Sequence, residues 1–210
     1  MKLFPTLFQH PALLSAILLT GFAGCGRPGT PSKAPSFDEV LATRRSIRSY
    51  DASKSISEAE VCELLTAVQD APSWANMQPT RYYVALSPEK REALLGLIGM
   101  NRQRVDAAPV LIVSAYERGL SGFFSGEQTN ELGDLWGAHD NGLSDSYLVL
   151  KARAMGFDTL IMGIRDADGI RALFDIPESQ TIMAVIALGY RAADPQRPDR
   201  KPLDSIVRFY

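Results

Sequence analysis

The chain has 210 residues, and 46% of them are hydrophobic, which is enough for one well-filled core but not for two separate domains. Lysine and arginine number 22 against 24 aspartates and glutamates, and the resulting net charge of −2 excludes a protein that binds polyanions through its overall charge. The two cysteines and two histidines form no CxxC or Cys/His cluster, and no P-loop, G-x-G-x-x-G or G-x-S-x-G motif occurs. These absences argue against a thiolate zinc site, a Walker-type nucleotide site and a serine nucleophile elbow.

The first 24 residues have the pattern of an export signal. Lys2 precedes an apolar run over 12–23 that is too short to span a bilayer comfortably. The run ends in "FAGC", which resembles the lipobox of bacterial lipoproteins, so we predict a lipoprotein-type signal peptide over 1–24 and a lipid on Cys25. An ordinary signal peptide, or an uncleaved anchor with an incidental cysteine, is the alternative. The prediction places the protein on a membrane of the bacterial envelope, whereas without export it would be cytoplasmic. Removal of Lys2 leaves the mature chain with a net charge of −3, which is −2 minus +1.

Residues 25–35 are rich in Gly, Pro and Ser, which is typical of a linker, and 36–210 are predicted to form one domain. Ser36 is expected to cap a first helix, because two acidic residues follow it and suit the positive end of the helix dipole.

The remaining elements alternate between helices and strands. Ser57 and Glu60 form a capping box for the clearest helix, in which Cys62 is expected to be a small core residue. Further helices are predicted near 87–99, 134–155 and 167–174, and strands over 81–86, 110–116, 159–163 and 181–190. The segment between 117 and 136 has no clean period and predicts a mobile loop. About four strands mixed with several helices indicate a three-layer α+β domain.

Three polar clusters are candidates for a binding site. They are Arg44, Arg45, Ser46 and Arg48 after the first helix, Ser73, Asn76, Gln78 and Pro79 in a loop, and Arg197, Arg200 and Lys201 in the tail. Guanidinium groups bind phosphate oxygens in pairs, and side-chain amides suit the edge of a heterocycle. The alternatives are a solvated helix end, ordinary turn chemistry and a solubilising charged tail, respectively.

The order of four segments resembles the FMN-dependent nitroreductase family. The segments are "RRSIRSYD", "APSWANMQPTRYYV", "GLSDSYLVLKARAMGFDTLIMG" and "ALGYRAADPQRPDRKPLDSIV". The resemblance implies a nitroreductase-like three-layer α+β fold, with a central, mostly antiparallel sheet flanked by helices. It also implies a homodimer with FMN at the interface between the two subunits.

The resemblance assigns the charged clusters to the phosphate end of FMN. Contacts to the phosphate and ribityl chain or to the pyrimidine edge are implied for Arg44, Arg45, Ser46 and Arg48. Contacts to the phosphate are implied for Arg200 and Lys201. A phosphate dianion would explain why an acidic protein concentrates arginines there.

The resemblance assigns the amide loop and one strand end to the flavin ring. Asn76 would hydrogen-bond the ring, and the residues that shape its pocket would be Pro72, Ser73 and Gln78. Met162 and Gly163 would pass close to the ring, with a backbone N–H near flavin N5.

The implied activity is the transfer of hydride from NAD(P)H through flavin N5 to a nitroaromatic, a quinone or a similar oxidised acceptor. Neither a catalytic side chain nor a metal is required, because the flavin carries the chemistry. A lone histidine such as His139 on a long helix is more often structural. The alternatives are another flavin reaction on the same scaffold (dehalogenation, azoline oxidation or flavin fragmentation) and a surface lipoprotein that binds FMN without turnover.

Overall fold

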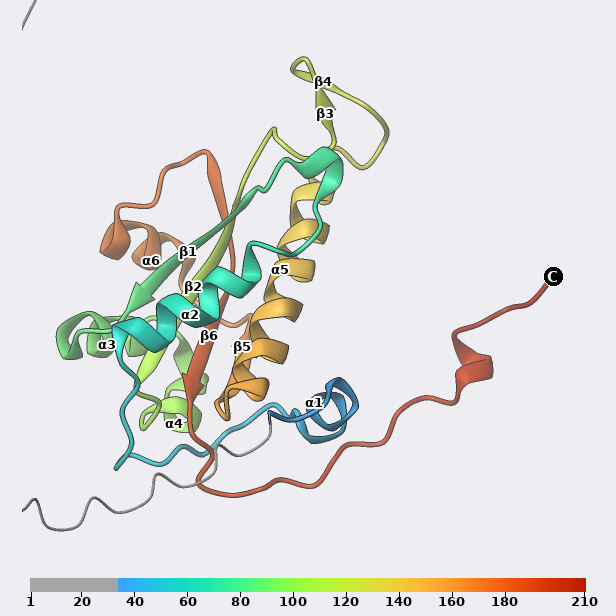
Figure 1. Ribbon diagram of the computed structural model, residues 1–210. Helices are drawn as coiled ribbons and strands as arrows, with labels where there is room; N and C mark the ends of the chain where they lie inside the picture. Colours follow the sequence, from blue (N-terminus) through green and yellow to red (C-terminus); the bar gives the residue numbers. More distant parts are fainter. Residues whose placement is uncertain (1–33) are drawn as a thin grey trace, which may run out of the picture. The chain divides into compact units, whose positions relative to one another are not determined.

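A four-stranded antiparallel sheet is the centre of the molecule, with strand order β1-β2-β6-β5 (Figure 1). The computed structural model describes residues 34–210, so the predicted signal peptide, Cys25 and most of the predicted linker lie outside the described residues. The strands are β1 (Thr80–Ala85), β2 (Val110–Glu117), β5 (Asp158–Met162) and β6 (Gln180–Gly189). All four predicted strands are therefore confirmed, with bounds shifted by at most one residue at either end.

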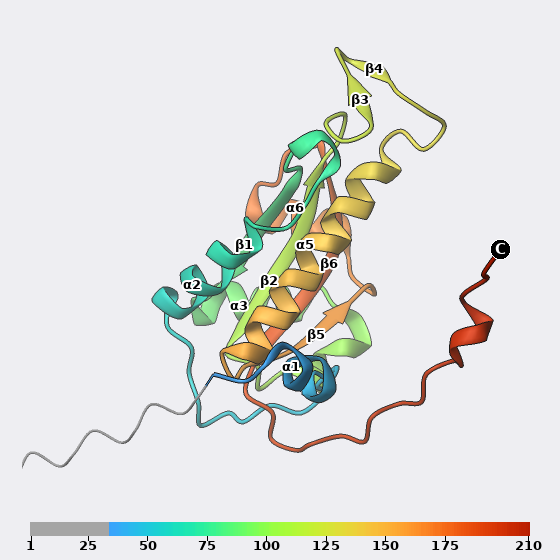
Figure 2. The ribbon, with the colours of Figure 1, turned by 45° about the vertical axis from the view of Figure 1, so that its right-hand side comes forward.

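Helices cover both faces of this sheet, as the two ribbon views show (Figures 1 and 2). They are α1 (Phe37–Thr43), α2 (Glu58–Val68), α3 (Pro88–Leu95), α4 (Arg102–Val105), α5 (Leu135–Ala154) and α6 (Ala167–Phe174). One face packs against α2 and α5, and the other packs against α3, α4 and α6. The predicted three-layer α+β fold is confirmed.

Strand β2 explains why the sequence shows an unbroken apolar run at this point. Val110 and Ile112 pack into the core under α2 and α5, whereas Leu111 and Val113 pack into the core on the other face. A strand buried on both sides has no polar face, and each large apolar side chain buried there contributes about 1.5–3 kcal/mol.

Local contacts set where helix α1 begins and where helices α1 and α5 end. Ser36 and Glu39 form a reciprocal capping box, in which the Glu39 N–H donates to Ser36 Oγ (3.3 Å) and the Ser36 N–H donates to Glu39 Oε2 (2.6 Å). Because α1 ends at Thr43, the arginines that follow lie on an extended segment rather than on the helix. Long helix α5 ends before Gly156, whose φ of +88° turns the chain toward β5.

Two sequence expectations need correction. Cys62 is an exposed free thiol rather than a core residue, because it is one position from the buried Val61 and a helix turns about 100° per residue. The segment predicted as a loop contains a small hairpin, formed by β3 (Phe123–Phe124) and β4 (Glu127–Gln128).

The tail after Gly189 leaves the sheet and ends well away from it in both views (Figures 1 and 2). Its apolar side chains are open to solvent, with Leu203 67% and Phe209 91% exposed. Across residues 34–210, no helix combines the length and the apolar character that crossing a membrane requires.

Candidate functional site

A cavity of about 150 Å³ lies between the segment after α1 and the first part of the tail. It is lined by Arg44, Arg45, Ser46, Arg48, Pro195, Gln196, Pro198 and Arg200. The lining contains four guanidinium groups and no carboxylate, and none of the four forms an ion pair with any group in the described part of the chain. The cavity is therefore a compact positive site that suits a small polyanion.

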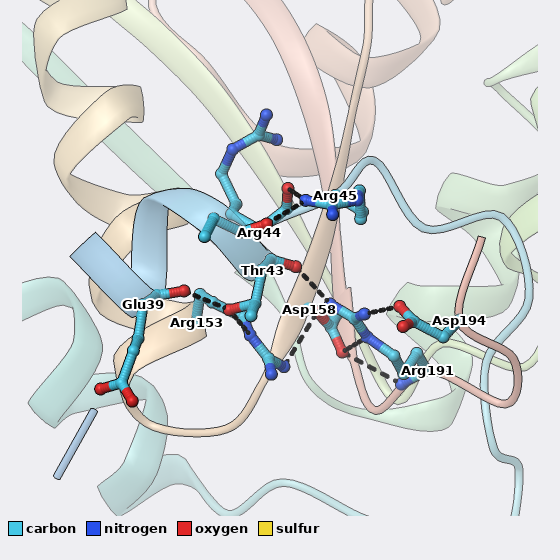
Figure 3. Close-up of polar contacts among 9 residues, drawn as sticks. Glu39, Thr43, Arg44, Arg45, Arg153, Asp158, Arg191 and Asp194 are labelled. Carbon is cyan, nitrogen blue, oxygen red and sulfur yellow. Dashed lines mark hydrogen bonds and ion pairs between the residues drawn. The ribbon is translucent and has the colours of Figure 1, made fainter. Parts of the chain in front are cut away.

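The backbone of the arginine segment is fixed against the edge of the sheet. The Ile47 N–H donates to the carbonyl of Thr159 in β5 (3.0 Å), and the Ile47 side chain is buried in the core. Arg45 turns back on α1, where its Nη1 donates to the carbonyls of Ala42 (2.7 Å) and Arg44 (2.8 Å). This contact satisfies carbonyls at the C-terminal end of α1 (Figure 3).

The cations of the cavity repel one another. Burial lowers the pKa of Arg44, and the positive charges of Arg200, Arg45 and Arg197 lower it further. Within residues 34–210, Nε of Arg45 is buried without a hydrogen-bond partner. An unpaired buried donor and repelling charges are both stabilised by an anion, so the residues present fit a phosphate group.

The loop before β1 has a strained backbone. Ala75, Asn76 and Gln78 have φ values of +46°, +59° and +49°, in the left-handed region that favours glycine. Each such residue costs about 1–3 kcal/mol and persists only when its surroundings fix it. Strain of this kind concentrates at ligand-binding sites.

Hydrogen bonds hold this loop to itself and to α5. The Trp74 N–H donates to Oδ2 of the buried Asp140 in α5 (2.9 Å). The Gln78 N–H donates to Ser73 Oγ (3.0 Å), and Gln78 Nε2 donates to Asn76 Oδ1 (3.1 Å). The side chains of Asn76 and Gln78 are exposed, so the amides face outward on a fixed backbone.

A larger cavity of about 330 Å³ adjoins the loop, between α2, β1 and α5. Ser73, Gln78 and Ser144 are among its lining residues, and beside it lies a buried acid, Asp145. The Asp145 carboxylate accepts from the hydroxyls of Tyr82 (2.9 Å) and Ser114 (2.8 Å). Burial raises the pKa of Asp145, and these two hydrogen bonds only partly offset the effect.

The structure does not bring the arginine cavity and the amide loop together within one chain. Asp140 holds the loop at one end of α5, and Arg153, thirteen residues later, contacts Thr43 beside the arginines at the other end. At 1.5 Å per residue these anchor points are about 20 Å apart along the helix. The loop also leads into edge strand β1, whereas the arginines lie beside the opposite edge strand, β5.

The other predicted ring contacts lie on the arginine side. Met162 ends β5 with its side chain buried in the core, and the exposed Gly163 follows it. From Thr159, which pairs with the arginine segment, the strand rises about 10 Å over three residues to Met162. Lys201 is exposed and does not line the cavity.

Several groups near the site carried no recognisable signal in the sequence. Gln196 lines the cavity, and the buried Asp158 forms an ion pair with the half-buried Arg191, whose guanidinium contacts Thr43 next to Arg44. Asp158 begins a strand and Arg191 follows one, which is an ordinary place for a charged residue. For residues 34–210, no cluster of three or more His, Cys, Asp or Glu residues is placed to hold a metal ion.

Comparison with known proteins gives consistent results. A sequence model of the Nitroreductase family matches residues 41–190. YdgI of Bacillus subtilis, a candidate NAD(P)H nitroreductase, is 28% identical over 206 residues, covering 84% of this chain and 99% of that protein. An NADH dehydrogenase of Thermus thermophilus is 27% identical over 189 residues, covering 78% of this chain and 91% of its own. A candidate nitroreductase of Exiguobacterium sibiricum, crystallised in complex with FMN, is 25% identical with a TM-score of 0.76, covering 86% of this chain and all of that one.

Proposed function

The chain belongs to the nitroreductase family, and we propose that it is an FMN-dependent oxidoreductase. It would take electrons from NAD(P)H and deliver them to a nitroaromatic, a quinone or a similar small oxidised acceptor. The observation that carries the proposal is the cavity lined by four arginines without a carboxylate. Such a cavity fits the phosphate of FMN, and a family relative of similar fold was crystallised with this cofactor.

The residues of the cavity would bind and orient the cofactor. Arg44 and Arg45 are half-buried, so their charge-assisted hydrogen bonds to a phosphate would be stronger than those of the exposed Arg48 and Arg200. Ser46 adds a hydroxyl on the same wall. When bound, FMN supplies a ring that accepts an electron pair from NAD(P)H and passes it to the acceptor, so the protein needs to provide position and electrostatics only.

The amide loop would complete the site from a second copy of the chain. Asn76 and Gln78 offer donors and acceptors suited to a ring edge, but their loop lies at the opposite end of α5 from the arginines. We therefore propose a homodimer in which the loop of one subunit faces the cavity and Gly163 of its partner. The exposed apolar side chains of the tail support this proposal, because Leu203, Ile206 and Phe209 would be covered by a partner subunit.

We further propose export and lipidation at Cys25, on the basis of the apolar run that ends in "FAGC". Because NAD(P)H is scarce outside the cytoplasm, an exported enzyme would take its electrons from a different donor in the envelope, whereas a chain that stays in the cytoplasm would take them from NAD(P)H. Mass spectrometry of membrane-extracted protein should find an acylated Cys25 as the first residue. A soluble product that begins at Met1 would contradict the proposal.

Anaerobic reduction of the purified full-length chain tests the enzymatic function. The protein should be yellow as purified, and its visible absorbance should bleach on mixing with NADH or NADPH and return when a quinone or nitroaromatic is added. Flavin that is bound but reduced by neither nucleotide would point to a binding protein or a different reductant. A colourless protein that binds no added FMN would overturn the proposed function.

A further inference from the structure

A buried carboxylate, that of Asp158, belongs to a network of polar contacts that reaches the end of α1, next to the arginines of the cavity (Figure 3). The side chain of Asp158 is 2% exposed and accepts from Arg191 through both arms of the guanidinium, with Nε to Oδ2 at 2.8 Å and Nη2 to Oδ1 at 2.5 Å. Nη1 of Arg153 approaches the same Oδ1 at 3.4 Å. A forked pair of this kind fixes both the position and the plane of the guanidinium.

The network joins the segments that carry the cavity's arginines. Nη2 of Arg191 donates to the carbonyl of Thr43 (3.1 Å), which is bonded directly to Arg44. Nε of Arg153 donates to the Thr43 hydroxyl (3.1 Å), and this hydroxyl donates to the carbonyl of Glu39 one turn earlier in α1 (2.6 Å). The end of α1 is thus held from two sides by arginines that the carboxylate of Asp158 orients.

The same residues fix the start of the tail. Arg191 pairs in an isolated bridge with Tyr50, and the N–H of the next residue, Ala192, donates to the carbonyl of Ser49 (3.0 Å). Four residues after Arg191 the tail reaches the cavity, where Arg200 joins the lining. The guanidinium of Arg191 lies outside the lining of the cavity and connects the end of α1, through the Thr43 carbonyl, with the start of the tail, through Asp194.

The charges of the network cancel, unlike those of the cavity. Arg153 and Arg191 are matched by Asp158 and by the exposed Asp194, which also accepts from Arg191. The network consequently carries no net charge, and its arginines are engaged with carboxylates. A role in placing other arginines, rather than in binding an anion themselves, follows from this difference.

We propose that Asp158 is a positioning residue for the phosphate end of the cofactor site. Through the fork to Arg191, it sets the end of α1 and the root of the tail, and so the distance between Arg44 and Arg200. The inference rests on the proposed FMN site. It predicts that loss of the fork weakens recognition of the phosphate and leaves recognition of the ring intact.

Comparison of FMN with riboflavin, which lacks the phosphate, tests this role. Affinities of the full chain for both ligands are measured by quenching of flavin fluorescence. Asp158→Asn should lower the preference for FMN over riboflavin by about tenfold, because that is the effect of losing one charge-assisted contact to the phosphate. Its affinity for riboflavin should stay within about twofold of that of the wild type. Arg191→Lys keeps the ion pair but cannot fork, so it should lower the same preference to a smaller extent.

A matched control and the possible outcomes separate this inference from the proposed function. Glu92→Gln removes an exposed ion pair with Arg102 and should leave the FMN preference unchanged. Equal weakening of both ligands, or an unchanged or higher FMN preference in Asp158→Asn, overturns the positioning role while the proposed function stands. If Asp158→Asn does not fold, the preference for FMN over riboflavin is measured in Arg191→Lys instead. An unchanged preference in that variant overturns the positioning role. A wild-type chain that binds neither flavin refutes the proposed function, and the positioning role with it.

Discussion

Replacement of Arg44 by alanine should change the empty and the flavin-bound protein in opposite directions. The guanidinium of Arg44 makes no hydrogen bond or ion pair with any group between residues 34 and 210, and three neighbouring arginines depress its pKa in addition to burial. Its removal therefore costs the empty protein no polar contact and relieves repulsion. We expect the melting temperature of Arg44→Ala without flavin to be equal to or above that of the wild type.

The Arg44→Ala variant should also bind FMN more weakly than the wild type. A charge-assisted hydrogen bond from a half-buried guanidinium contributes about 1.5–3 kcal/mol, which corresponds to a roughly ten- to hundredfold weaker Kd. At a fixed excess of FMN, a tenfold weaker Kd removes about 1.4 kcal/mol of ligand stabilisation. For a chain of this size the FMN-induced rise in melting temperature would then shrink by about 3–6 °C.

Two assays measure these opposite effects. Titration of flavin fluorescence gives the Kd, and circular dichroism melts with and without FMN give the two melting temperatures. Arg48→Ala is the matched comparison, since Arg48 lines the same cavity but is exposed and should lose only about two- to fivefold in affinity. If Arg44→Ala melts lower when empty and binds FMN as the wild type does, Arg44 has a structural role and the cavity is not the phosphate site.

Three further predictions concern the loop, the tail and the buried acid. Asn76→Ala should alter turnover or flavin redox potential more than flavin content, because its amide would touch the ring; kinetics at saturating FMN together with a redox titration check this. Removal of residues 202–210 should yield a monomer with little bound flavin, measured by light scattering and absorbance, and an intact flavin-bound dimer would exclude a role for the apolar tail. Burial raises the pKa of Asp145, so ionisation of this carboxyl destabilises the fold, fully at a pH above the raised pKa. The penalty declines as the pH falls through the raised pKa and is gone below the ordinary pKa of an aspartate. Asp145→Asn should therefore melt higher than the wild type at neutral pH, with a difference that narrows in acid; a difference independent of pH would show that ionisation of Asp145 is not its cause.

The parts of the fold that depend on local chemistry were predictable from the sequence. Ser57 with Glu60, and Ser87 followed by Pro88, mark helix starts through contacts that span three residues or fewer, and both starts are confirmed. The β3–β4 hairpin was missed because strands of two residues are too short to show an alternating pattern. Cys62 was misplaced because a position next to an apolar stripe can face either the core or solvent.

The site was predictable in composition but not in geometry. The arginines after α1 and the amide loop are visible as clusters in the sequence. Within one chain these clusters lie at opposite ends of α5. That placement depends on the strand order and on the length of α5, which no local sequence pattern specifies. The pairing of Asp158 with Arg191 likewise joins residues 33 positions apart that look unremarkable in isolation.

Helix α5 fixes the distance between the amide loop and the arginine segment within one chain. It supports the loop through Asp140 and the arginine segment through Arg153, so one rigid rod fixes both the spacing and the angle between two half-sites. Deletion of a single residue between these anchors would rotate one half-site by about 100° relative to the other and shorten the spacing by about 1.5 Å. Insertion of seven residues would nearly restore the angle but lengthen the rod by about 10 Å. Substitutions on the exposed face of α5 should therefore be tolerated far better than any change in its length.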